Sequence, residues 1–167
     1  MNKLQALKAI AAAIGASGVI FNRGNAAVAS VAVLVFAVLI FAVETITYRH
    51  RGFVASINLV GLVLTITFAS LMGKLDQPFD RFFMLVVIAS LFQLLSETVL
   101  NLRNGWFKKG NYAHMINWAL HLIVWSLFAL LPSIDTIGAI GIFGVYAGIL
   151  AVHWGIEATG PKPLKQD

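Results

Sequence analysis

The chain lacks cysteine and is poor in charged residues. Of its 167 residues, 12 are Lys or Arg and 7 are Asp or Glu, so that only 11% are charged. The absence of cysteine excludes disulfide bonds and thiolate metal ligands. A soluble domain carries about 25% charged residues, whereas this chain is 59% hydrophobic with a mean hydropathy of +0.86. So few charges do not cover a globule in water, and the composition therefore indicates a surface that faces lipid.

Long apolar runs make up most of the sequence. A helix needs about 20 apolar residues to cross the hydrocarbon core of a bilayer, and backbone groups in lipid must be satisfied within the segment. The sequence therefore predicts an all-α polytopic membrane protein, a single transmembrane domain over residues 1–167 with six helices that cross the bilayer. The predicted spans are approximately 4–21, 26–47, 53–73, 82–102, 115–134 and 136–157, followed by a cytoplasmic tail over 158–167.

The first of these segments, Leu4–Phe21, permits three interpretations. It is rich in Ala and Gly, and Lys8 interrupts it. A basic start followed by small apolar residues is also typical of a cleaved secretory signal, and an interfacial helix is the third possibility. We favour a true transmembrane helix because the internal repeat described below includes this segment.

Basic residues are distributed unequally between the two sides of the predicted bundle. With six spans, nine lie on the side of the termini: Lys3, Lys8, Arg49, Arg51, Arg103, Lys108, Lys109, Lys162 and Lys165. The other three are Arg23, Lys74 and Arg81. Loops rich in Lys and Arg face the cytoplasm, so both termini are predicted to be cytoplasmic. Five of these residues are candidates for binding anionic lipid headgroups: Arg49, Arg51, Arg103, Lys108 and Lys109. Because the basic residues lie between apolar runs, the net charge of +5 does not indicate nucleic-acid binding.

The six predicted spans group into three hairpins with a common pattern. The returning helices align best. Val43-Glu44-Thr45 matches Ser96-Glu97-Thr98, and His153 falls at the corresponding position. Hairpins that all start and end on one side are parallel repeats, related by an axis along the membrane normal.

The third hairpin carries a more specific pattern. A helix from Trp118 to Pro132 is followed by Gly141-Ile-Phe-Gly-Val-Tyr-Ala-Gly148 and then by Gly155-Ile156. This hairpin resembles the short repeat of the HdeD-type acid-resistance membrane proteins, in which a helix with a terminal proline turn precedes a Gly-x-Tyr-Ala helix. The resemblance implies a six-helix protein of the bacterial inner (plasma) membrane, linked in some members to acid stress. It implies no enzymatic chemistry and transfers no catalytic residue.

Ionisable side chains within the predicted spans are the main candidates for function. Glu44, Glu97 and His153 lie near the inner ends of returning helices, and His121 shares a helix face with Asn117. An ionisable group inside a span costs about 2.5–3.5 kcal/mol on insertion scales, so it usually faces the bundle interior. One interpretation is a ring that holds protons, accepts a cation or binds a basic segment. We favour a structural interpretation, in which the carboxylates either snorkel to the interface or pair with Arg49 or Arg103. In this interpretation His153 is an interfacial residue, and His121 is a buried neutral imidazole bonded to Asn58 or Ser96.

No metal site, cofactor site or catalytic motif is recognised. The spacing of His121 and His153 matches no metal-ligand motif. Nucleophilic catalysis needs a base beside a Ser or Cys, and the serines lack the local signatures of such a pair. Gly-rich phosphate loops are also missing from the sequence. We therefore expect no metal, no cofactor and no enzyme activity.

The last predicted helix carries a row of glycines: Gly141, Gly144, Gly148 and Gly155. Gly144 and Gly148 form a small-xxx-small pair, which lets another helix backbone approach closely. We favour packing within the chain, against the Ala9, Ala13 and Ala16 face of the first helix.

Two classes of function follow. The first is a non-enzymatic integral membrane protein of HdeD-like type, with a structural or stress-response role or as an accessory subunit. Such a protein packs against anionic lipids and against other membrane proteins, or against itself as a homo-oligomer. Short loops, the glycine row and the lack of a catalytic motif favour it. The alternative is a small transporter or proton-handling channel that uses Glu44, Glu97 and His121.

Overall fold

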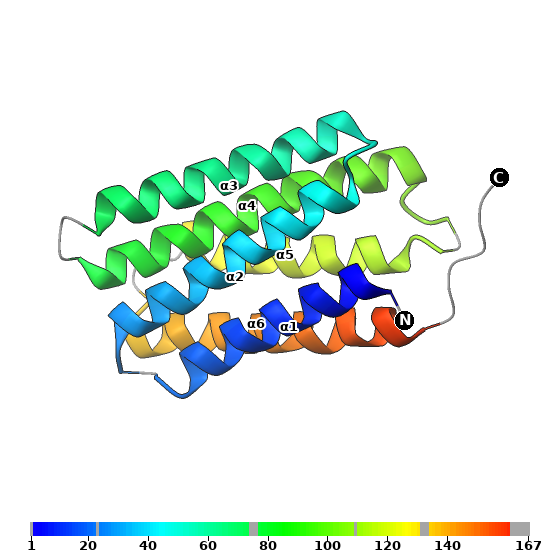
Figure 1. The fold of residues 1–167 in the computed structure, drawn as a ribbon. Helices are drawn as coiled ribbons and strands as arrows, with labels where there is room; N and C mark the ends of the chain where they lie inside the picture. The colour runs from blue at the N-terminus through cyan, green and yellow to red at the C-terminus, as the bar shows by residue number, and fades with distance from the viewer. Residues whose placement is uncertain (1, 23, 74–76, 109, 131–133, 161–167) are drawn as a thin grey trace.

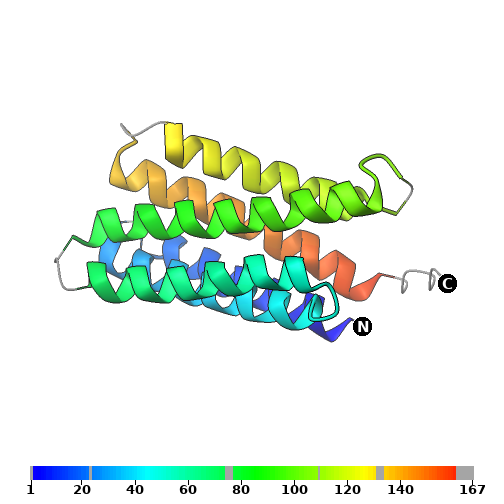
Figure 2. The same cartoon turned by 90° about the horizontal axis from the view of Figure 1, so that it is seen from above.

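The computed structural model describes residues 2–22, 24–73, 77–108, 110–130 and 134–160, and it is all-helical over these residues. The helices are α1 (Lys3–Ile20), α2 (Ala26–Thr47), α3 (Gly52–Met72), α4 (Pro78–Asn104), α5 (Tyr112–Leu130) and α6 (Thr136–Thr159). All six are long and apolar enough to cross a membrane, which confirms the predicted all-α class and number of spans. They run side by side, with the connections at the two ends of the bundle (Figure 1 and Figure 2).

The start of α1 and the end of α6 meet at one end of the bundle. The backbone N–H of Asn2 donates to the carbonyl of Ala158 at 2.9 Å. We call this end, with the α2–α3 and α4–α5 connections, the termini end, and the opposite end the turn end. That the termini end faces the cytoplasm stays a prediction. Several residues named above lie outside the described residues: Arg23, Lys74, Lys109, Pro132, Lys162 and Lys165.

Local sequence signals set the helix starts. The side chain of Asn25 caps α2 by accepting hydrogen bonds from the N–H groups of Ala27 and Val28, both at 3.1 Å. Asp135 caps α6 by accepting from the N–H of Gly138 at 2.7 Å. Such caps satisfy backbone donors that have no partner within the helix.

The structure extends α4 and α5 beyond the predicted spans. α4 begins at Pro78 rather than at residue 82, because proline at the first helical position has no N–H to satisfy. It ends at Asn104, before Gly105, whose φ of +85° favours glycine. α5 begins at Tyr112 rather than at residue 115, which brings His114 into the helix. These polar turns were missed because hydropathy detects only the apolar centre of a span.

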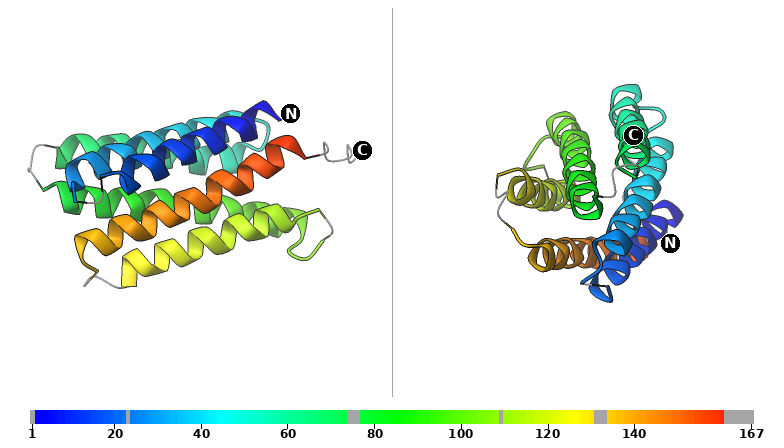
Figure 3. Two further views of the ribbon diagram at one scale, coloured as in Figure 1. Left: turned by 90° about the horizontal axis from the view of Figure 1, so that it is seen from below. Right: turned by 90° about the vertical axis from the view of Figure 1, so that its left-hand side faces the viewer.

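α1 packs mainly against α6, although the two helices are farthest apart in sequence (Figure 3, left). Its buried stripe contains the small residues Ala11, Ala12, Gly15 and Ala16. Ala16 of the predicted face belongs to this stripe and Ala9 is partly buried, whereas Ala13 is exposed, so the predicted face is wrong at Ala13. Small residues allow close approach of the two backbones. α1 is therefore a full member of the bundle.

The three hairpins do not pack alike. The α1–α2 and α3–α4 pairs are closely packed, whereas α5 and α6 barely touch and α1 occupies the space beside α6. The end-on view shows α5 and α6 as separate neighbours at the edge of the bundle (Figure 3, right). The equivalence of the three hairpins as parallel repeats thus stays a prediction.

The two halves of the bundle differ in chemistry. Aromatic rings fill the turn-end half: Phe143 packs edge-on against Phe36 and Phe82, with ring centroids 5.5 and 6.1 Å apart. Phe128 lies 6.1 Å from Phe82, and all four side chains are at most 1% exposed. The termini-end half instead holds most of the buried polar groups of the described chain. The candidate site lies there.

Candidate functional site

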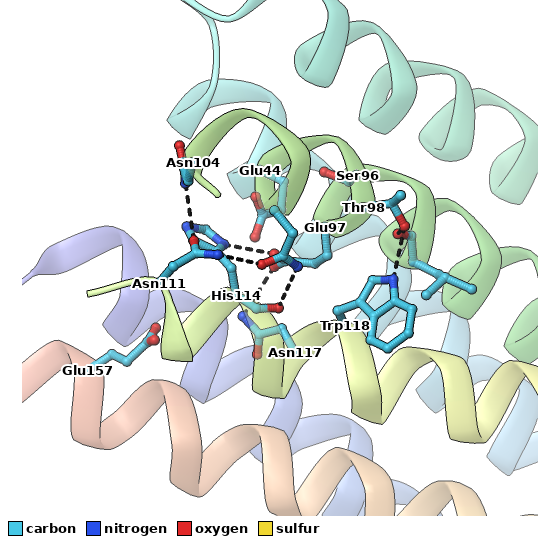
Figure 4. Close-up of polar contacts among 12 residues, drawn as sticks. Glu44, Ser96, Glu97, Thr98, Asn104, Asn111, His114, Asn117, Trp118 and Glu157 are labelled. Atoms are coloured by element: carbon cyan, nitrogen blue, oxygen red, sulfur yellow. Dashed lines mark hydrogen bonds and ion pairs between the residues drawn. The ribbon is translucent and has the colours of Figure 1, made fainter. Parts of the chain in front are cut away.

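Six side chains from five helices form a connected group at the termini end, which we call the polar network. Its members are Lys8 of α1, Glu44 of α2, Glu97 of α4, His114 and Asn117 of α5, and Trp154 of α6. Figure 4 shows Glu97 and its two partners from α5 pointing toward one another, with Glu44 directed at the same group. α3 contributes no member.

An ion pair between Lys8 and Glu44 joins α1 to α2. The ammonium group contacts Oε1 of the carboxylate, and the two side chains are only 5% and 2% exposed. The ammonium also lies over the ring of Trp154, 4.4 Å from the centroid, a placement that the ring quadrupole favours. The packing of α1 against both α2 and α6 therefore gives the lysine two partners in the bundle.

Glu97 is the centre of the network. Its Oε2 lies 2.7 Å from Nδ1 of His114, and its Oε1 accepts a hydrogen bond from Nδ2 of Asn117 at 3.1 Å. The Oδ1 of Asn117 in turn accepts from Nε1 of Trp154 at 3.2 Å. Both oxygens of this buried carboxylate are thus bonded, and the chain of contacts ties α4 to α5 and α6.

Two asparagines hold the start of α5 against α4. Nδ2 of Asn101 donates to the backbone carbonyl of His114 at 3.2 Å, and Nδ2 of Asn111 donates to Oδ1 of Asn101 at 2.7 Å. Both asparagines are buried, at 0% and 4% exposed. They fix the turn from which His114 reaches Glu97.

A separate amide group joins α3 to α4. Asn58 donates from Nδ2 to Oγ of Ser96 at 3.0 Å and accepts from Nε2 of Gln93 at 3.0 Å. These three side chains are buried and bonded to one another. This is the structural use of buried polar residues, since each of these hydrogen bonds joins α3 to α4 inside the bundle.

His121 lies outside the polar network, bonded to another residue. Its Nδ1 is 2.6 Å from the hydroxyl of Tyr146 on α6, and the two share a hydrogen bond. Its Nε2 is buried and has no partner among the described residues. Neither the predicted association of His121 with Glu44 and Glu97 nor its predicted bond to Asn58 or Ser96 is therefore observed among the described residues. Its face-sharing neighbour Asn117 contacts Glu97 instead.

His153 also lies apart from the polar network. Its Nε2 is 3.5 Å from Oε1 of Glu157, one turn further along α6, and its side chain is 16% exposed. The alignment that placed His153 at the depth of Glu44 and Glu97 therefore does not bring it into contact with them. The next residue, Trp154, takes that position.

The predicted pairing of the carboxylates with loop arginines is wrong for the described residues. Arg49, Arg51 and Arg103 are exposed, and the ion pairs that involve Glu44 and Glu97 go to Lys8 and His114. Arg49, Arg51, Arg103 and Lys108 are exposed at the termini end, where their contact with lipid headgroups stays a prediction; Lys109 lies outside the described residues.

Tyr48 follows the last residue of α2 and borders the network without adding charge. Burial raises the pKa of its hydroxyl well above the usual value of 10.0. The phenol is therefore neutral at every pH at which the protein would function. The guanidinium carbon of Arg51 lies over the ring of Tyr48, 5.9 Å from its centroid.

The chemistry available to the network is the holding and transfer of protons. Among the described residues, no group of three His, Cys, Asp or Glu side chains is arranged to hold a metal ion. No hydroxyl group in the described chain is hydrogen-bonded to Glu97 or His114, so a nucleophile activated by these residues is not seen. A carboxylate bonded to an imidazole at 2.7 Å is instead a suitable pair for sharing a proton.

Three members of the network were missed from the sequence. Lys8 was counted only among the basic residues on the side of the termini, His114 preceded the predicted start of its span, and Trp154 was not singled out beside His153. Helical spacing gave a usable signal for Lys8 and His114. His114, Asn117 and His121 are three and four residues apart and share a face. Lys8 lies on the stripe of buried small residues of α1.

An apolar groove separates α5 from α6. It has a volume of about 460 Å³ and is lined by ten residues, of which Tyr146 alone has a polar side-chain atom. Leu120, Val124 and Leu127 form the α5 wall, and Gly141 lies on the α6 wall. Here two consecutive helices leave space that neither fills.

The glycines of α6 divide into two sets. A Cβ atom on Gly144 would lie 2.9 Å from a side-chain carbon of Ile20, so this glycine lets α1 approach α6. Gly141, Gly148 and Gly155 have no described atom within 4 Å of the position of a Cβ. The predicted partner within the chain is therefore present at Gly144 and absent, among the described residues, at the other three.

Comparison with known proteins gives the chain no relatives. No protein-family model matches it, and no curated protein or solved structure is similar enough to be matched. The HdeD-type resemblance therefore stays a prediction from the residues of the third hairpin. The polar network and the open face of α6 are the observations from which function is inferred.

Proposed function

We propose that this integral membrane protein is a non-enzymatic accessory subunit whose α5–α6 groove receives a transmembrane helix of a partner membrane protein. The observation that carries the proposal is the open groove of about 460 Å³ between two consecutive helices. In the α1–α2 and α3–α4 hairpins the corresponding space is closed by direct packing. A partner helix would complete the third hairpin in the same way.

The glycine face supports a helix as the occupant rather than lipid alone. Gly141, Gly148 and Gly155 are seven residues apart, so they lie on one side of α6, and the space beside each is open. Lipid chains adapt to any apolar surface and gain nothing from a missing side chain. A second helix gains close backbone contact, as α1 does at Gly144.

The setting of this subunit is proposed from the sequence. The HdeD-type resemblance supports a stress-response role in a bacterial inner membrane, and the distribution of basic residues supports cytoplasmic termini. Exposed Arg49, Arg51 and Arg103 support contact with anionic headgroups at the termini end.

Single-cysteine cross-linking in native membranes tests the proposal. The chain contains no cysteine, so Val145→Cys introduces a unique thiol on the groove wall. We expect a cross-linked product of defined size, lost when Gly148→Leu fills the open face. Val63→Cys on α3 is the matched control, since Val63 is 54% exposed and Val145 is 63% exposed. The proposal would be contradicted if the cross-linker joined both cysteines to lipid equally and gave no protein adduct at Val145→Cys. An adduct of twice the chain mass would identify the partner as a second copy.

A small proton-handling transporter is the second candidate, because Glu44 and Glu97 are ionisable groups buried within membrane helices. The packed rings of Phe36, Phe82 and Phe143 oppose it, since they close the turn-end half of the bundle. Proton flux into proteoliposomes that disappears in Glu97→Gln would favour this candidate over the accessory subunit.

A further inference from the structure

We propose that the polar network is a binding site for one exchangeable proton, held between Glu97 and His114 and reached from the termini end. The site is independent of the α5–α6 groove, so it stands whether or not a partner helix binds there. The inference rests on the number of charges that the bundle buries and on the contacts of each.

The buried charges do not balance without this proton. Glu44 and Glu97 supply two negative charges and Lys8 supplies one positive charge. Burying an uncompensated charge costs several kcal/mol. With a proton on His114 the network is neutral, and without it one negative charge remains.

The other ionisable groups near the network do not supply the missing charge. Tyr48 is neutral, and His121 is bonded to the hydroxyl of Tyr146. His153 and Glu157 pair with each other on α6. The loop arginines are exposed. The balancing charge therefore falls on the imidazole that contacts Glu97.

The contacts of Glu97 direct the proton to one oxygen. Trp154 donates to Oδ1 of Asn117, which orients the amide so that its Nδ2 donates to Oε1 of Glu97. Oε1 therefore already accepts a hydrogen bond from the amide of Asn117, which does not release its proton. The remaining oxygen, Oε2, faces Nδ1 of His114 at 2.7 Å. The exchangeable proton thus lies on Nδ1 and is donated to Oε2.

His114 is also the route by which the proton enters and leaves. Its side chain is 25% exposed, whereas those of Glu97, Lys8 and Glu44 are 3%, 5% and 2% exposed. Oε2 of Glu44 is buried and has no donor among the described residues. When His114 loses its proton, the described contacts leave one buried negative charge uncompensated.

Nitrogen-15 NMR of the full chain, labelled at its four histidines and embedded in lipid bilayers, tests the site. At about pH 7 we expect one imidazole with both nitrogens protonated. This signal should be lost in His114→Gln and should become that of a singly protonated ring in Glu97→Gln. His50→Gln, which removes an exposed imidazole from the α2–α3 connection, is the control and should leave it unchanged.

Two results would overturn the proposal. The first is a singly protonated His114 in the wild-type chain at about pH 7. A His114 signal that changes only when sodium is added counts as the same result, because the site would then bind the cation and not a proton. The second is a doubly protonated His114 whose signal does not change in Glu97→Gln. Should that variant fail to accumulate in the membrane, the wild-type and His114→Gln spectra still decide whether the ring carries the proton.

Discussion

At the scale of single residues, the termini-end half of the bundle depends on a few charged side chains with specific partners. Lys8 has a carboxylate and an aromatic ring as partners, and Glu97 has an imidazole and an amide. In a region without water, removing one partner leaves the other charge buried and unpaired. The cost of such a substitution is therefore larger than the net contribution of the pair.

Lys8→Met should strongly destabilise the protein, by about 3–5 kcal/mol in the free energy of unfolding, because Glu44 is left unpaired at 2% exposure. Chemical unfolding in detergent measures the loss. The double variant Lys8→Met with Glu44→Leu should recover most of it, since no buried charge remains. Lys3→Met, an exposed lysine on the same helix, is the matched control. A single variant as stable as this control would show that Glu44 has another partner.

The stability of the bundle should also fall as the pH rises through the range of imidazole titration, about pH 5 to 8. Loss of the proton from His114 leaves one uncompensated negative charge in the folded network, and the unfolded chain has no such cost. Thermal unfolding in lipid nanodiscs across this range measures the slope. Glu97→Gln should flatten it and His50→Gln should not. An unchanged slope in Glu97→Gln would place the titrating group elsewhere.

At the scale of the helices, α6 has two faces with different partners. One face, at Gly144, receives α1, and the other, at Gly141, Gly148 and Gly155, is open. Under our proposal, one face of α6 therefore packs within the chain and the other packs against a partner. Two substitutions on the same helix separate these roles.

Gly144→Leu should lower the stability of the isolated protein by about 1–3 kcal/mol, because its Cβ would lie 2.9 Å from a side-chain carbon of Ile20 and 3.2 Å from one of Val19. Gly148→Leu, with nothing within 4 Å, should leave that stability close to wild type. Melting temperatures in detergent compare the two. Equal losses would mean that Gly148 also has a partner within the chain.

The helices could be predicted from sequence, whereas their neighbours could not. Hydropathy and length are local properties, so the spans were located to within a few residues. The contact of Lys8 with Trp154 depends on α1 lying beside α6, and nothing local to residues 3–20 specifies that contact. His114 was missed for a related reason, since only the tertiary bonds of Asn101 and Asn111 show that its turn belongs to α5.

At the scale of the whole molecule, the bundle has a polar termini-end half and an aromatic turn-end half. The rings of Phe36, Phe82 and Phe143 close one half, while the polar network reaches the surface of the other through His114. Under our proposal, protons therefore reach the network from the termini end. Such an arrangement suits a site that responds to the pH of one compartment better than a path across the bilayer.

The side that this site faces is predicted by the distribution of basic residues. Reporter fusions at Asp135, at the turn end, and after the C-terminal residue should report opposite sides of the membrane, with the C-terminus in the cytoplasm. A fusion at the N-terminus should agree with the C-terminus, because α1 crosses the bundle from one end to the other (Figure 1). Reports from one side at both Asp135 and the C-terminus would contradict six crossings.

The most direct measurement of the proposed function is a density map of the protein isolated with its native lipids from the native membrane. We predict a helix of another chain in the α5–α6 groove, in close backbone contact with Gly141 and Gly148, while the Lys8–Glu44 and Glu97–His114 contacts are kept. A solitary chain whose groove holds only lipid density would contradict the accessory role.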